Sequence, residues 1–257
     1  MYTQPRPGTV RRRQGNSGWK LLGCGCLGAL GLLIVLAVVG IFFLLPRLPD
    51  LAASIVGMTS RGPTDAVFVE NQPAPTVELQ NTTEPAQVTV NLGSYGGEQT
   101  LTTDNPAYDV TVGSDTTGRE TAVVTFTEAG LMDVCRQQND ICSGADPRFQ
   151  NARIDLKPGG AIIYADVSVP SGYGFDVQQT AGVVLQLDGS GRQFVFSGID
   201  LNGNLYTNPP AELASTVQQF EQTGNDVLNQ VSINAGGGTL MLQRAQIDEE
   251  TLSLVMQ

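Results

Sequence analysis

The sequence predicts an α+β protein, with an N-terminal single transmembrane helix followed by a curved, mostly antiparallel sheet packed on a long helix in the C-terminal half. Three observations indicate this class. Residues 21–45 are apolar or small and carry no charge, residues from Val88 onward alternate between apolar and polar, and residues 210–231 carry apolar side chains at helical spacing. We therefore divide the chain into residues 1–20, 21–45, 46–86 and 87–257.

The first segment, residues 1–20, has the composition of a disordered tail. It contains two prolines, three glycines and an arginine triplet, but almost no large apolar side chain. Such a segment buries too little apolar surface to offset the entropy lost on ordering. We expect a disordered, basic, cytoplasmic tail.

The second segment, residues 21–45, is long enough to span a bilayer. At about 1.5 Å per residue it would extend roughly 38 Å, which exceeds the roughly 30 Å of the hydrocarbon layer. Basic residues without acidic ones precede it, whereas all 25 acidic residues follow it. Because basic flanks stay in the cytoplasm, the predicted localisation is the cell membrane, single-pass, with a cytoplasmic N-terminus and an extracytoplasmic C-terminal domain. The lipid bilayer is then a partner.

A cleaved signal peptide or a lipoprotein signal is the rival interpretation of the same stretch. Residues 21–24 imitate the tetrad at which a lipoprotein is cut. However, the apolar run of a lipoprotein precedes its cysteine, whereas here it follows Cys24. The order favours an uncleaved anchor.

Residues 46–86 are predicted to form a juxtamembrane segment and linker, because glycine and proline punctuate them from Gly62 onward. Alternation then predicts strands around residues 88–92, 108–112 and 122–127. Thr127 can cap a following helix, and Glu128 favours its positive end.

The most regular alternation begins at Ala152 and predicts antiparallel hairpins. Runs on either side of residues 158–160 form the first, and runs on either side of residues 188–191 form the second. The apolar parity shifts at Gly198, which predicts a β-bulge that bends the sheet.

A long helix is predicted after the hairpins. Asn208 can cap it, and prolines at 209 and 210 suit its first turn. Gly224 interrupts its apolar stripe, and residues 236–238 end the segment. We expect a last strand containing Leu240 and Leu242, and a short terminal helix or strand from Asp248.

Cys135 and Cys142 are predicted to form a disulfide, which is the simplest state of two nearby cysteines in an oxidising compartment. Metal binding is the poorer interpretation, because the spacing is not that of a zinc knuckle and the chain has no histidine. We therefore expect no metal site and no cofactor.

Catalysis is disfavoured by composition. The absence of histidine excludes Ser-His-Asp and Cys-His arrangements, and no glycine-rich stretch matches a phosphate-binding loop. Paired carboxylates could still serve a glycosidase-like reaction. The candidates in or beside strands are Asp155, Asp166, Asp188 and Asp200. Acids on the polar face of a half-exposed sheet are the commoner explanation, so we expect no catalytic residues and no enzyme.

Two further ligand classes are disfavoured. Asp200, Asn202 and Asn204 begin like a calcium loop, but the sixth position is Leu205 where glycine is required. The strongly acidic balance after Leu45 and the few aromatic residues argue against a nucleic-acid partner.

The order of elements from about residue 120 to 257 resembles a family of bacterial membrane-anchored envelope proteins of unknown or lipid-linked function. These proteins have a half-barrel sheet wrapped on a long helix, similar to tubular lipid-binding domains. The resemblance implies an extracytoplasmic protein that holds a lipid or other amphiphile between sheet and helix. The residues that we expect to line this ligand groove are Val183, Leu185, Leu187, Phe194, Phe196, Val217 and Phe220. The alternative is a structural or protein-interaction ectodomain with a closed core and no ligand.

Overall fold

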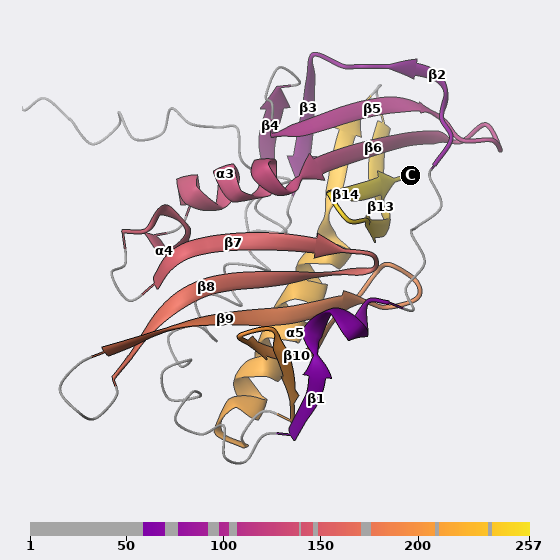
Figure 1. The fold of residues 1–257 in the computed structure, drawn as a ribbon. Helices are drawn as coiled ribbons and strands as arrows, with labels where there is room; N and C mark the ends of the chain where they lie inside the picture. The colour runs from indigo at the N-terminus through magenta and orange to yellow at the C-terminus, as the bar shows by residue number, and fades with distance from the viewer. Residues whose placement is uncertain are drawn as a thin grey trace, which may run out of the picture.

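The described part of the protein is mostly β (Figure 1). The computed structural model describes residues 59–69, 77–91, 98–102, 107–138, 140–145, 149–170, 176–208, 211–235 and 238–257. These residues form two antiparallel sheets, and helices make up a smaller part of the fold. The predicted α+β class, with one curved sheet packed on a long helix, is therefore wrong, because the chain builds a second sheet from segments far apart in sequence.

The first sheet has six strands in the order β1-β11-β10-β9-β8-β7. Their bounds are Thr59–Pro63, Asn204–Thr207, Phe194–Leu201, Asp176–Leu187, Gly160–Pro170 and Phe149–Lys157. The β7–β8 and β9–β10 hairpins confirm the two predicted from alternation. The predicted bulge is confirmed as well, because the β9–β10 register shifts between Phe196 and Gly198.

The second sheet has eight strands in the order β2-β5-β6-β14-β13-β12-β3-β4. Their bounds are Gln80–Thr83, Tyr108–Ser114, Glu120–Thr127, Thr251–Met256, Gly238–Ile247, Ser232–Ala235, Gln87–Asn91 and Glu98–Thr102. The last strand of the chain, β14, lies between β6 and β13. Strands β1 and β2 and the short 3-10 helix η4 (Thr64–Val67) fall in the stretch that the sequence assigns to a linker.

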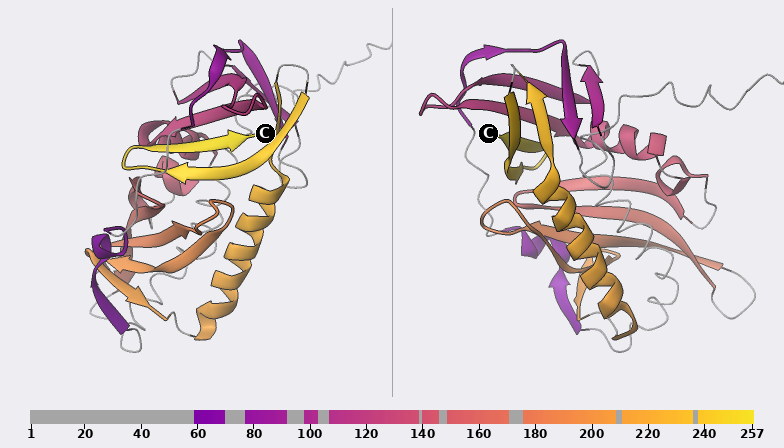
Figure 2. Two further views of the ribbon diagram at one scale, coloured as in Figure 1. Left: turned by 90° about the vertical axis from the view of Figure 1, so that its right-hand side faces the viewer. Right: turned by 180° about the vertical axis from the view of Figure 1, so that it is seen from behind.

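Two helices cover strand edges. Helix α3 (Glu128–Gln138) follows β6 directly, and the Thr127 hydroxyl caps it by accepting from the Gly130 N–H at 3.1 Å, as predicted. The Glu128 carboxylate accepts from the Leu156 N–H of β7 at 2.7 Å. Helix α5 (Ala211–Gln230) lies against β10 and also contacts β13 (Figure 2).

One large hydrophobic core joins the apolar faces of both sheets with α3 and α5. A smaller core lies on the other face of the six-stranded sheet, where Phe68 beside η4 covers Ile162, Val184 and Leu205. The η4 segment therefore acts as a cover for that face.

The predicted localisation is corrected by the structure. Among the residues described, no helix is both long enough and apolar enough to cross a membrane. Helix α5 has 20 residues, but it is amphipathic: Val217 and Leu228 are buried, whereas Gln218 and Asn229 are exposed. The single-pass cell-membrane prediction therefore finds no support, and residues 1–20 and 21–45, on which it depends, lie outside the described residues.

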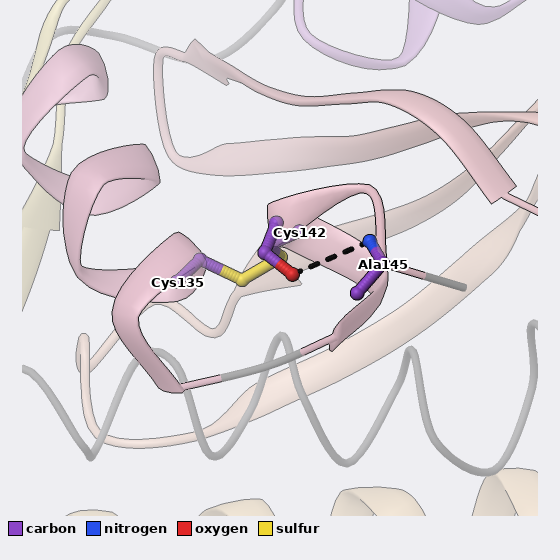
Figure 3. The surroundings of a disulfide bond; sticks show 4 residues. Cys135, Cys142 and Ala145 are labelled. Carbon is purple, nitrogen blue, oxygen red and sulfur yellow. Dashed lines mark hydrogen bonds between the residues drawn. A yellow bond between two sulfur atoms is a disulfide. The ribbon is translucent and has the colours of Figure 1, made fainter. Parts of the chain in front are cut away.

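Cys135 and Cys142 form a disulfide, as predicted (Figure 3). Their Cα atoms are 5.5 Å apart, and the bond connects α3 with the short helix α4 (Asp140–Ser143). Both side chains are buried in the main core. The bond therefore fastens the end of α3 to the segment that leads into β7.

We expect reduction of this disulfide to lower the free energy of unfolding by about 2.5 kcal/mol, because a cross-link with a sequence separation of 7 restricts the unfolded chain by that amount on the entropy model. Urea denaturation with and without dithiothreitol measures the difference. The double variant Cys135→Ala/Cys142→Ala is the control and should not respond to dithiothreitol. An unchanged midpoint for the reduced wild type would contradict the bond's role.

Candidate functional site

The residues of the predicted ligand groove lie mostly in the core. Val183, Leu185 and Phe194 are 1%, 2% and 3% exposed. Leu187 and Phe196 are partly buried against the same cluster, and Val217 of α5 belongs to it. The side chain of Phe220 lies outside the described residues. An amphiphile at this place would have to displace packed core side chains.

Helix α5 closes the edge of β10 with polar side chains. Strand β10 pairs with β11 only from Ile199 onward, so its first residues have no neighbouring strand on that side in the described part of the chain. Asn225 fills the gap: its Oδ1 accepts from the Phe194 N–H at 2.8 Å, and its Nδ2 donates to the Phe194 carbonyl at 3.1 Å. Glu221, one helical turn earlier, accepts from the Phe196 N–H at 2.7 Å. The helix thus takes the place of a neighbouring strand.

Replacing Asn225 by alanine should lower the free energy of unfolding by about 2 kcal/mol, because the Phe194 N–H and carbonyl both lose their partner. Asn225→Asp retains the acceptor alone and should cost less. Asp226→Ala changes the exposed neighbour and serves as the control. Equal urea midpoints for Asn225→Ala and Asp226→Ala would contradict the edge-closing role.

The four acids considered for glycosidase-like chemistry all make contacts within the fold. Asp155 pairs with Lys157 at 3.2 Å, and Asp188 accepts from the Ser190 hydroxyl at 2.6 Å. Hydrogen bonds from Asn151 and then Thr180 hold the pKa of Asp166 below its usual value. A general acid needs a raised pKa, so Asp166 is unsuited to that role.

The fourth acid, Asp200, is 1% exposed and fastens the cover of the smaller core. Its carboxylate accepts from the Thr64 hydroxyl of η4 and from the Gly203 N–H at 3.0 Å. Burial, and then the charge of Asp200, raise the pKa of Tyr164. No group of three or more potential metal ligands occurs among the described residues, which include Asp200.

A pocket of about 550 Å³ lies where the two sheets meet, within the usual range for small-molecule sites. We call it the seam pocket. Strands β13 and β14 supply one wall with Gln243, Arg244, Val255 and Gln257. The remaining lining comes from Val77 and Glu78 before β2, from Asp115 and Thr116 after β5, and from Ser190 in the β9–β10 turn. None of the predicted groove residues whose side chains are described lines it.

A β-bulge places two successive polar side chains in the seam pocket. In the β13–β14 pair, Leu242 faces Met256 and Arg244 faces Val255, so that Gln243 is the extra residue. Gln243 and Arg244 both line the pocket, although neighbours in a regular strand point to opposite faces. Bulges commonly redirect side chains beside binding sites.

The β9–β10 turn is fixed beside these two residues. Gly191, at φ +67°, lets the turn approach β13, and its carbonyl accepts from the Ala245 N–H at 2.7 Å. A Cβ added at Gly191 would lie 3.2 Å from the Arg244 Cβ and would clash with the Ala245 carbonyl oxygen. The turn that carries Ser190 is therefore held tightly against the eight-stranded sheet.

Hydrogen bonds hold the Asp115 side of the pocket in place. Its Oδ1 accepts from the Thr117 hydroxyl at 2.7 Å and from the Thr117 and Arg119 N–H groups at 2.8 and 3.0 Å. Its Oδ2 accepts from Gln257 Nε2 at 2.9 Å. The Thr117 hydroxyl, followed by the Arg119 N–H, lowers the pKa of Asp115 to about 2. The carboxylate is thus ionised near neutral pH and is held in place by donors from the turn and from Gln257.

Thr117→Val should raise the pKa of Asp115 from about 2 towards 3.8, because the largest cause of the shift is removed. A lowered native pKa stabilises the fold above the unfolded pKa of 3.8, and this contribution disappears as the pH falls towards 2. As the pH falls, the variant should therefore lose order in this turn at a higher pH than the wild type does. Carboxyl ¹³C NMR titration measures the midpoint, with Thr116→Val as the control. Equal midpoints in both variants would show that the hydroxyl is unimportant.

Arg244 is the only cation among the described residues that line the seam pocket. It is half-buried, and its side chain forms no ion pair or hydrogen bond with another residue in the described part of the chain. Glu78 is exposed and equally unpaired within those ranges. An arginine in a pocket without a partner is a candidate for binding an anionic group.

Sequence reasoning missed this pocket, although one signal was present. Leu240 and Leu242 alternate, but the next buried residue is Ala245 and not residue 244. The same kind of parity shift correctly predicted the bulge at Gly198. No pattern in the sequence, however, shows that the β9–β10 turn and residues 77–78 line the same pocket as β13.

The resemblance to bacterial envelope proteins stays a prediction. Comparison of the chain with protein-family models, curated proteins and solved structures gave no match.

Proposed function

We propose that the chain is a non-catalytic binding protein that takes a small polar ligand in the seam pocket. The observation that carries this proposal is an unpaired, half-buried arginine in a pocket of about 550 Å³. The pocket lies away from the predicted groove residues, which are occupied in packing.

The construction of the walls supports a binding role. The Asp115 turn is held by four hydrogen bonds to its carboxylate, and the β9–β10 turn is bonded directly to β13. A site with fixed walls loses little conformational freedom when a ligand enters, which favours affinity. Val77 and Val255 add an apolar surface between the polar groups.

The non-catalytic part of the proposal follows from residue chemistry. The chain has no histidine, and the acidic wall residue Asp115 has a lowered pKa that suits neither a general acid nor a base near neutral pH. Its oxygens are occupied by the turn. Binding without reaction is what these groups support best.

A melting-temperature screen of the full chain tests the proposal. The compounds are the common amino acids, small dicarboxylates, monosaccharides and, as the amphiphile, a fluorescent fatty acid. We expect at least one polar compound to raise the melting temperature of the wild type, because a ligand stabilises the state that binds it. Thr116→Trp, which fills the pocket from an exposed turn, should abolish the effect.

Two further variants make the screen decisive. Thr100→Trp changes an exposed threonine on β4 and should respond like the wild type. Gln243→Trp fills the pocket from the other wall and replaces Thr116→Trp if that variant melts abnormally without ligand. The proposal fails if no polar compound stabilises the wild type, or if the pocket-filling variants respond normally. Stabilisation by the fatty acid alone would instead favour the amphiphile predicted from the sequence.

A further inference from the structure

From the charges that line the seam pocket, we infer that its ligand is a small α-amino acid in its zwitterionic form. Arg244 holds the carboxylate, Glu78 holds the ammonium group, and the two valines of the wall receive an apolar side chain. This inference depends on the proposed function and specifies the ligand class for the same site.

The carboxylate partner follows from the state of Arg244. A guanidinium group presents parallel N–H donors that match the two oxygens of a carboxylate, and charge-assisted pairs of this kind are the strong ones. Asp115 lines the same pocket but forms no ion pair with Arg244 in the described part of the chain, and its oxygens accept from Thr117, Arg119 and Gln257. Arg244 is therefore left to bind an anion from outside the protein.

The partner of the ammonium group follows from Glu78, an acidic residue of the pocket lining. A ligand that carried only a carboxylate would be attracted by Arg244 but repelled by Glu78, which lines the same pocket. Glu78 and Arg244 both line the pocket, and they form no ion pair with each other in the described part of the chain. A ligand with one charge of each sign satisfies both residues, whereas a simple anion or cation satisfies one.

The apolar part of the ligand follows from the valines. Val77, which is half-buried, and Val255 line the pocket together with the two charged residues and give it an apolar part. Covering such a surface with an aliphatic side chain is favourable, because it removes apolar area from water. L-leucine combines this side chain with both charges and is the probe that we choose.

Charge deletion in the ligand and in the protein provides the test. Isothermal titration calorimetry is performed on the full chain with L-leucine, with L-leucinamide, which lacks the carboxylate, and with 4-methylpentanoate, which lacks the ammonium group. The protein variants are Arg244→Gln and Glu78→Gln. Thr116→Trp is included as the pocket-filling control.

We expect L-leucine to bind the wild type about tenfold more tightly than either analogue, because each analogue loses one charge pair. Arg244→Gln should weaken L-leucine and 4-methylpentanoate by a similar factor but leave L-leucinamide unchanged. Glu78→Gln should weaken L-leucine and L-leucinamide but leave 4-methylpentanoate unchanged. Misfolding of a variant would weaken all three compounds together, so this crossed pattern separates recognition from stability.

The contrary results are equally distinct. If L-leucine does not bind, or if each variant affects all three compounds alike, the zwitterion inference is overturned. Where another polar compound still binds the wild type and is excluded by Thr116→Trp, the proposed function survives this failure. Where no polar compound binds at all, both fail together.

Discussion

Replacing Phe126 by alanine is expected to lower the free energy of unfolding by about 3–5 kcal/mol, the usual cost of removing a fully buried aromatic side chain. Phe126 lies on β6, is 0% exposed, and packs with the Tyr108 ring at a centroid distance of 5.9 Å. It is among the largest fully buried side chains of the described core. The truncation removes apolar contacts and leaves a cavity that the two sheets cannot fill without shifting.

Urea denaturation followed by circular dichroism measures this loss. Phe126→Leu keeps most of the volume and should cost less than half as much, because core sites tolerate changes that preserve volume. Val195→Ala is the control, since Val195 is 45% exposed on β10. If Phe126→Ala and Val195→Ala unfold at the same urea concentration, the two sheets do not share the core described.

Gly130→Ala should destabilise the protein by more than about 3 kcal/mol, above the usual cost of overpacking. Helix propensity alone predicts the opposite sign, a gain of about 1 kcal/mol, because alanine favours a helix more than glycine does. Gly130 lies in α3 against the backbone at Ala107: an added Cβ would clash with the Ala107 carbonyl oxygen and lie 2.7 Å from its carbon. Neither backbone segment can move away easily, so the clash decides the sign.

Gly189→Ala provides the matched control for this substitution. Gly189 lies in the β9–β10 turn, and an added Cβ there would have no neighbour within 4 Å. Its melting temperature should stay close to that of the wild type. A Gly130→Ala variant that melts above the wild type would show that α3 does not pack closely on the segment at Ala107.

The features predicted correctly from the sequence depend on short-range rules. The hairpin at residues 158–160 follows from alternation around a Pro-Gly-Gly turn, and the Thr127 cap follows from the residue preference of a helix start. The disulfide between Cys135 and Cys142 is likewise a local link. In each case the residues that determine the feature lie within about ten positions of one another in the sequence.

The features missed depend on contacts between distant segments. Strand β1 pairs with β11, about 145 residues later, and β14 inserts between β6 and β13. Alternation shows that a segment is a strand, but it does not show which partner the strand takes. The helical stripe of α5 was visible, whereas its use as an edge cover for β10 required the position of Asn225 beside Phe194.

The seam pocket likewise combines a local feature with contacts between segments that are distant in the sequence. Its bulge at Gln243 leaves a local trace in the sequence, but its walls come from five separate segments of both sheets. The residues chosen from the sequence for a groove, such as Val183 and Leu185, are apolar and regularly spaced because they form the core. Apolar periodicity therefore identified residues that pack in the core, and it gave no signal for a pocket with polar walls.

Chemical-shift mapping of the ¹⁵N-labelled full chain, titrated with the polar compound that raises its melting temperature most, tests the central claim that the ligand site is the seam pocket. We predict that the largest amide shifts occur at Glu78, Thr116, Ser190, Gln243 and Arg244, which line the pocket from both sheets. Shifts concentrated at Val183, Leu185 and Phe194, or no shifts at saturating ligand, would contradict it.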